Sequence, residues 1–277
     1  MKRILSLLII SALILNIPVS CKKDKGDPPD VPSVESMEID FENFEPKPPT
    51  KGDHETPFYK GAQDSNWELA SNAAMLWKAI INTTLAVPVY SFRQVAGKSP
   101  VYIDDNTWQW SADATILNTT YSARLTGQVG ASAIEWKMYI SKAGTGSYTD
   151  FLWFTGTSAK DGKSGEWVLF ESKENPVEIL RIDWTKPGEK IGEIIYTFTK
   201  NGNPLKDSFI RYGLTTNTLN AFYEISYYNS SYQQVFELDV EWNTSVGNGR
   251  VRCPAIFEND DWYCWDEAHI NSECIGG

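Results

Sequence analysis

The sequence predicts a mostly β fold, an antiparallel meander that closes into a β-barrel or a sandwich, with an N-terminal helical segment packed on it. Three observations support this. Beyond residue 100 the hydrophobic periodicity is two, turn residues recur every ~10–15 positions, and aromatic side chains make up 13% of the 277 residues. Short connections between consecutive strands favour a meander over a Greek key.

The composition is that of a globular protein with enough material for a core. Apolar residues form 42% of the chain and charged residues 22%. The formal net charge is −11, and no run of basic residues extends beyond Lys22 and Lys23. An acidic surface repels phosphate backbones, so the sequence excludes nucleic acid as a partner.

The first residues have the organisation of a secretion signal. Met1-Lys2-Arg3 is a short basic start, and the apolar stretch from Ile4 to Ile17 is too short for a stable membrane span. It ends in Pro18-Val19-Ser20-Cys21, where a small residue directly precedes a cysteine. We therefore expect residues 1–20 to be a signal peptide.

This segment resembles the lipobox of bacterial lipoproteins, although Pro18 stands where the family usually has Leu. The resemblance implies a lipid anchor on Cys21, with diacylglycerol on the thiol and an acyl group such as palmitate on the new amino terminus. Two or more acyl chains hold a protein stably on a membrane. Lys22 stands where an inner-membrane retention signal would place Asp, which implies the outer membrane. Residues 22–25 resemble the charged export tags of Bacteroidota surface lipoproteins, but the periplasmic or surface face stays undecided.

Residues 21–56 are rich in Pro, Lys, Asp and Glu, which predicts a lipidated flexible tether before a single β domain at 57–277. Within the tether, 37–41 alternates apolar and acidic residues and is a candidate strand that docks onto the domain. Helices are expected near 65–97. The first follows N-cap oxygens at 64–66, and a second begins near Pro88 and ends at Gly97.

The β region shows clear two-residue alternation, which predicts that one row of bulky side chains faces a core. The clearest examples are the apolar rows within 134–140, 180–184 and 236–242. Turns that suit positive φ separate the strands. These turns lie at Asp104-Asp105-Asn106, Gly144-Thr145-Gly146, Asp161-Gly162 and Asn201-Gly202.

Three cysteines lie near the C-terminus, and an exported protein meets an oxidising compartment. Pairing of Cys264 with Cys274 is favoured, with Cys253 as a buried leftover thiol, although the pair Cys253 and Cys264 stays open. No Cys-x-x-Cys motif or set of four soft ligands is present, so a staple that holds the tail is the better interpretation.

Few residues suggest catalysis. The two histidines are His54 in the tether and His269 in the tail, and the acidic residues of 259–267 lack EF-hand spacing. The sequence therefore predicts no catalytic residues, no metal site and no cofactor. Whether the protein is an enzyme stays open, with the negative answer favoured.

Aromatic side chains near the chain end are the candidate ligand-binding residues, namely Trp262, Tyr263 and Trp265. The leading interpretation is a non-enzymatic cell-envelope lipoprotein that binds a ligand, either an apolar molecule or a glycan. The predicted architecture is similar to that of lipocalin-like barrels, which implies the apolar ligand. A glycan hydrolase using paired carboxylates and a structural partner of an outer-membrane complex are the alternatives.

Overall fold

The computed structural model describes residues 26–45, 65–188 and 191–274. In these residues fourteen strands form one antiparallel sheet whose spatial order is the order of the sequence, β1 to β14. The predicted mostly β meander is therefore confirmed. The two edges are β1 and β14, which do not pair with each other, so the expected closure into a barrel or sandwich is not confirmed.

The elements have the following bounds: η1 Val34–Met37, η2 Glu42–Phe44, α1 Asn66–Ala96, β1 Val101–Tyr102, β2 Thr107–Ile116, β3 Thr119–Val129, β4 Ala133–Lys142, β5 Tyr148–Ala159, β6 Ser164–Phe170, β7 Glu178–Thr185, β8 Glu193–Phe198, β9 Phe209–Leu214, β10 Ala221–Asn229, β11 Gln234–Trp242, β12 Gly249–Arg252, α2 Pro254–Phe257, β13 Tyr263–Trp265 and β14 Asn271–Ser272. The four predicted hairpin turns all contain residues with positive φ, at Asp105, Asn106, Gly144, Gly146, Gly162 and Gly202.

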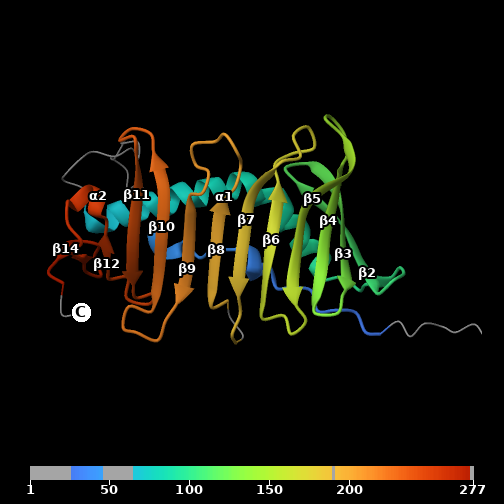
Figure 1. The fold of residues 1–277 in the computed structure, drawn as a ribbon, viewed down its shortest axis with the longest axis horizontal. Helices are drawn as coiled ribbons and strands as arrows, with labels where there is room; N and C mark the ends of the chain where they lie inside the picture. The colour runs from blue at the N-terminus through green and yellow to red at the C-terminus, as the bar shows by residue number, and fades with distance from the viewer. Residues whose placement is uncertain (1–25, 46–64, 189–190, 275–277) are drawn as a thin grey trace, which may run out of the picture.

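One long helix crosses one face of the sheet. α1 has 31 residues, which corresponds to a length of about 46 Å, and it runs behind the strands in Figure 1. It contacts β12 and β13 near its N-terminus and β2 and β3 towards its C-terminus. The axis of α1 thus runs across the strands. After the helix, the strands follow one another from its C-terminal end back to its N-terminal end. No helix of the described residues has the length and apolar character needed to cross a bilayer.

The prediction of a separate second helix that begins near Pro88 was wrong. α1 begins after Ser65, which forms a capping box with Glu68, and it continues through Pro88 to the C-cap Gly97. Proline removes one backbone hydrogen bond from a helix, but the Pro88 side chain is buried. Packing of both helix halves on the same sheet therefore outweighs the local effect of the proline.

The inner face of the sheet is a row of large side chains that α1 covers. The alternating rows Ile134–Ile140 on β4 and Phe236–Trp242 on β11 are buried as the two-residue periodicity predicts. Several tryptophans on this face lie directly across from a glycine on the next strand. The cross-strand pairs are Gly127 with Trp136, Gly156 with Trp167, Gly165 with Trp184 and Gly249 with Trp265.

These glycines are required because the indole lies on the neighbouring backbone. A Cβ atom at Gly156 would lie 2.2 Å from a Trp167 ring carbon, and one at Gly127 would lie 2.5 Å from a Trp136 ring carbon. The absent side chain gives each large ring the space that a second side chain would otherwise fill.

The segment 34–44 is part of the core, although the sequence places it in a flexible tether. Met37 and Phe44 are fully buried, and the segment forms two 3-10 turns instead of the expected strand at 37–41. Its polar atoms receive hydrogen bonds from buried rings. The Trp167 indole donates to Ser36 Oγ at 3.0 Å, and the Trp242 indole donates to Asn43 Oδ1 at 3.1 Å.

We expect Phe44→Ala to lower the free energy of unfolding by about 3–5 kcal/mol, because it removes a buried ring and leaves a cavity. Phe44 packs edge-on against Trp242 with ring centroids 4.8 Å apart. Chemical denaturation measures the effect, with the exposed neighbour Glu42→Ala as the control. Equal stability of the two variants would show that the segment does not contribute to the core.

Candidate functional site

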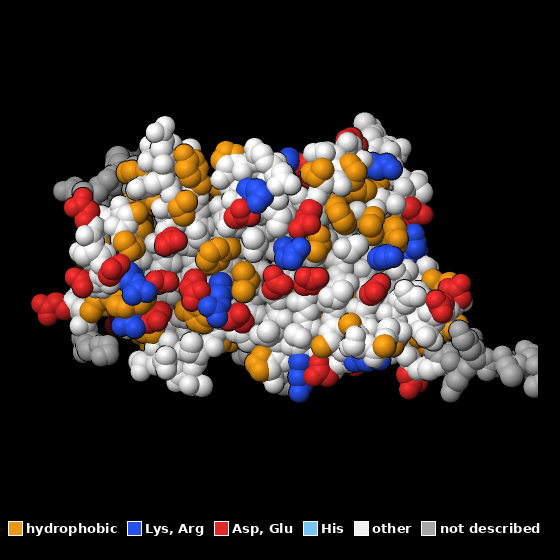
Figure 2. Space-filling view, in the orientation of Figure 1, with side chains coloured by type: hydrophobic (Ala, Val, Ile, Leu, Met, Phe, Trp, Pro, Cys, Tyr) orange, Lys and Arg blue, Asp and Glu red, His pale blue; other side chains and the backbone are white. Residues whose placement is uncertain are grey.

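The outer face of the sheet carries a band of charged side chains. Figure 2 shows acidic and basic groups intermingled across the middle of this face. The strand register explains the band, because each residue is the cross-strand partner of the next. The row from β4 to β12 is Glu135, Thr157, Glu166, Asp183, Ile195, Arg211, Glu224, Asp239 and Arg252.

At the β9–β12 end of this row, arginines and carboxylates form a network of ion pairs. Arg211 donates to both carboxylate oxygens of Glu224, at 3.0 and 2.9 Å, and also to Glu193. Arg252 Nε donates to Asp239 at 3.0 Å. The hydrogen bond to Glu193, followed by that to Glu224, raises the pKa of Arg211, and the bond to Asp239 raises the pKa of Arg252.

Two aromatic rings contact the arginines of this network. The guanidinium carbon of Arg211 lies 5.3 Å from the centre of the Phe222 ring. Arg250 and Arg252 both lie within cation–π range of Trp262, at 4.4 and 4.9 Å from the ring centre. Two arginines therefore hold Trp262 over β12, although Trp262 precedes β13 and lies in no strand itself.

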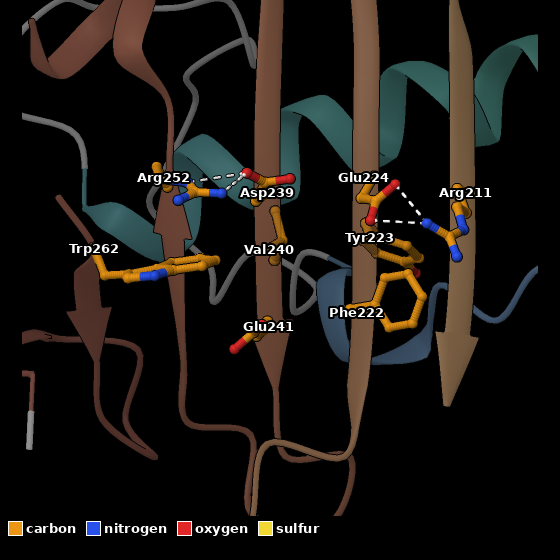
Figure 3. Close-up of a pocket in the computed structure, with 9 residues that line it drawn as sticks. All are labelled: Arg211, Phe222, Tyr223, Glu224, Asp239, Val240, Glu241, Arg252 and Trp262. Atoms are coloured by element: carbon orange, nitrogen blue, oxygen red, sulfur yellow. Dashed lines mark hydrogen bonds and ion pairs between the residues drawn. The ribbon is translucent and has the colours of Figure 1, made fainter. Parts of the chain in front are cut away.

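A hollow of about 250 Å³ lies between these two rings. Figure 3 shows its floor on β11, with Phe222 on one side and Trp262 on the other. Carboxylates and guanidinium groups line it together with the rings. The lining residues are Arg211, Phe222, Tyr223, Glu224, Asp239, Val240, Glu241, Arg252 and Trp262. The site thus combines apolar ring surface with planar hydrogen-bonding groups.

The structure separates the three aromatic residues that the sequence grouped as a candidate site. Only Trp262 lies at the hollow. Tyr263 is the cross-strand partner of buried Val251, and its ring stacks on Phe257 with centroids 3.7 Å apart. Trp265 is 2% exposed, and its indole donates to the carbonyl of Gly247 at 2.8 Å. Alternation across the sheet places Tyr263 and Trp265 on the face opposite to Trp262.

The other lining residues did not enter the sequence-based site, because their grouping depends on the pairing of β9 to β12. Two local signals indicate an outward charged row: Glu237, Asp239 and Glu241 alternate with buried residues on β11, and Arg250 and Arg252 are two residues apart on β12. Their acidic partners lie on β11, where Glu241 accepts from Arg250 Nε at 2.8 Å. Cross-strand partners of this kind are set by register and not by local sequence.

The cysteines are placed as the sequence favoured. A disulfide joins Cys264 of β13 to Cys274, which follows β14, and Cys253 is a buried free thiol. Burial raises the pKa of the Cys253 thiol to about 11, which keeps it protonated at neutral pH. The lipid-anchor candidate Cys21 lies outside the described residues.

The remaining polar candidates serve structural contacts. His269 stacks on Trp67 with ring centroids 4.2 Å apart, and His54 lies outside the described residues. Asp266 accepts backbone hydrogen bonds from Ala268 and Ile270, which caps the turn before β14. Across the described ranges, no group of three or more His, Cys, Asp or Glu residues is arranged to hold a metal ion.

A second groove, of about 420 Å³, lies between α1 and the segment 37–45. Its floor includes the apolar side chains of Met37, Ile81 and Leu85. Ion pairs join its two walls, one between Lys78 and Glu45 and one between Arg93 and Glu38. The floor side chains belong to the core.

The comparisons with known proteins give no relative on which to base a function. No family model matches the chain, no curated protein matches it, and no solved structure matches it. The function therefore has to be inferred from the geometry of the outer face.

Asp183 is the carboxylate of the band whose ionisation the fold disfavours. Burial, followed by the charge of its cross-strand neighbour Glu166, raises its pKa, while Arg181 opposes the shift. The protonated form is therefore favoured by folding. The protonated Asp183 therefore contributes to the free energy of unfolding. This contribution is fully present below the pKa of the unfolded chain, about 4, and is lost as the pH rises through the raised pKa of the folded protein.

We expect Asp183→Asn to raise the melting temperature at neutral pH and to change it little at about pH 3, because the amide cannot ionise. Thermal unfolding between these pH values measures the difference. Glu135→Gln, at an exposed position of the same row, is the matched control. An Asp183→Asn effect of constant size at every pH would contradict the assigned cause.

Proposed function

We propose that this protein is a non-enzymatic glycan-binding module of the bacterial cell envelope, held at the outer membrane by lipid on Cys21. The observation that carries the glycan proposal is the hollow between Phe222 and Trp262. A sugar ring has apolar C–H groups on its faces and hydroxyl groups around its edge. Aromatic surface combined with charged planar hydrogen-bonding groups complements both features.

The size and rigidity of the hollow support the same ligand class. Its volume of about 250 Å³ suits a small polar molecule such as a single sugar ring. Ion pairs already fix Arg211, Glu224, Asp239 and Arg252 in place, so little side-chain freedom is lost when a ligand binds. An apolar ligand fits less well, because charged groups make up much of the lining.

The arrangement argues against glycan hydrolysis at this hollow. Glycosidases use one carboxyl group as a proton donor and a second as nucleophile or base. Here Glu224, Asp239 and Glu241 each accept hydrogen bonds from an arginine, so every carboxylate of the hollow is already engaged by a guanidinium group. We therefore favour binding without catalysis.

We expect Trp262→Ala to weaken glycan binding by about tenfold or more, which corresponds to the loss of one stacked ring. Screening of the purified protein on a glycan array identifies the ligand, and titration calorimetry then compares the variants. The matched control is Tyr139→Ala, because Tyr139 is an outer-face ring under Arg124 at the other end of the sheet. Failure of the unaltered protein to bind any glycan, or equal binding by Trp262→Ala, would contradict the proposal.

The membrane attachment is tested separately. Cells grown with a clickable palmitate analogue should label the unaltered protein, and Cys21→Ser should abolish the label because the thiol that carries the lipid is gone. Cys253→Ser is the control and should keep the label, since that thiol is buried. Label retained by Cys21→Ser would show that the lipid is attached at another residue.

A further inference from the structure

A larger groove adjoins the hollow between Phe222 and Trp262. Its volume is about 780 Å³, and it lies between the β9–β10 connection, β12, β13 and the tail. It is lined by Asn217, Thr218, Leu219, Glu241, Val246, Asn248, Gly249, Arg250, Cys264, Trp265, Asp266, Glu267, Ser272, Glu273 and Cys274. The two cavities share Glu241, and Arg250 of the groove contacts the Trp262 ring that bounds the hollow.

The strand register joins the two cavities in one row. Phe222, Glu241, Arg250, Cys264 and Ser272 are successive cross-strand partners from β10 to β14. Neighbouring strands lie about 4.8 Å apart, so this row measures roughly 19 Å. That length exceeds a single sugar ring several times over, and it runs across the strands without leaving the outer face.

We propose that the hollow and the groove form one extended cleft that binds a linear oligosaccharide of neutral or amino sugars across β10 to β14. This inference rests on the glycan-binding function proposed above and specifies the ligand class. The hollow takes one ring between Phe222 and Trp262. The chain then passes Arg250 and continues along the groove towards the tail.

The charge of the cleft sets the ligand class. The two cavities together are lined by three guanidinium groups, from Arg211, Arg250 and Arg252. Six carboxylates oppose them, from Glu224, Asp239, Glu241, Asp266, Glu267 and Glu273. The excess of negative charge repels uronic acids and other anionic glycans, and it attracts the ammonium group of an amino sugar.

The groove keeps carboxylates available for a ligand. Glu241 is paired with Arg250, whereas the exposed Glu267 and Glu273 form no ion pair with another residue of the described chain. The disulfide between Cys264 and Cys274 holds the tail that carries Glu273 beside β13. The wall of the groove is thus fixed by a covalent bond, while its free carboxylates face solvent.

The experiment measures binding of β-1,4-linked glucosamine oligomers of one, two and four units, their N-acetylated counterparts, and galacturonic acid oligomers of the same lengths. Titration calorimetry at low and moderate salt gives each affinity. We expect the glucosamine tetramer to bind at least tenfold more tightly than the monomer. The galacturonic acid tetramer should bind at least tenfold more weakly than the glucosamine tetramer, with the difference decreasing as salt rises.

Charge reversal in the groove tests the assignment. The double variant Glu267→Lys with Glu273→Lys should weaken binding of the glucosamine tetramer at least fivefold and leave binding of the monomer unchanged, because the monomer occupies the hollow. The matched control, Glu135→Lys with Glu174→Lys, changes the net charge equally at two exposed positions outside both cavities. Thermal unfolding checks that each variant remains folded.

The outcomes separate the two proposals. Equal affinity for monomer and tetramer, with binding still lost in Trp262→Ala, would overturn the extended cleft and leave the glycan-binding function in place. Tighter binding of galacturonic acid oligomers, or equal effects of the two double variants, would also overturn it. No binding of any sugar by the unaltered protein would overturn the glycan-binding function, and the extended cleft with it.

Discussion

The packing of tryptophan rings onto cross-strand glycines is the constraint on which the rest of the structure depends. Each ring on the inner face takes the space that a neighbouring side chain would occupy, as Trp167 does over Gly156. The ring is then buried from above by α1 or by the segment 34–44. Phe92 of the helix lies edge-on to Trp167 with centroids 5.5 Å apart. The glycines therefore allow one helix to lie close to a wide sheet.

The buried inner face explains why the outer face is charged. In a two-layer structure, only one face of the sheet is covered, and alternation sends every second residue to solvent. Charged residues on neighbouring strands then lie side by side, and ion pairs such as Arg252 with Asp239 offset the repulsion between adjacent carboxylates such as Glu224 and Asp239. Exposed ion pairs contribute little stability, so this network adds little to the free energy of unfolding.

The same network of ion pairs determines where the hollow lies. Trp262 lies outside the strands, and its position depends on two guanidinium groups from β12. Those groups pair in turn with carboxylates of β11, and the disulfide between Cys264 of β13 and Cys274 holds the tail nearby. The hollow, its ion pairs and the disulfide are therefore concentrated at the C-terminal end of the sheet, far along the chain from Cys21.

The sequence by itself determined the local patterns, because strand alternation, turn chemistry and helix caps act between residues close in the chain. The meander, the inward rows of β4 and β11, and the helix limits at Ser65 and Gly97 follow from these. Only the tertiary structure decided that α1 continues through Pro88 and that Met37 and Phe44 enter the core. It also decided that Trp262 lies at the same hollow as Phe222, because that grouping depends on register between strands, which no short stretch of sequence encodes.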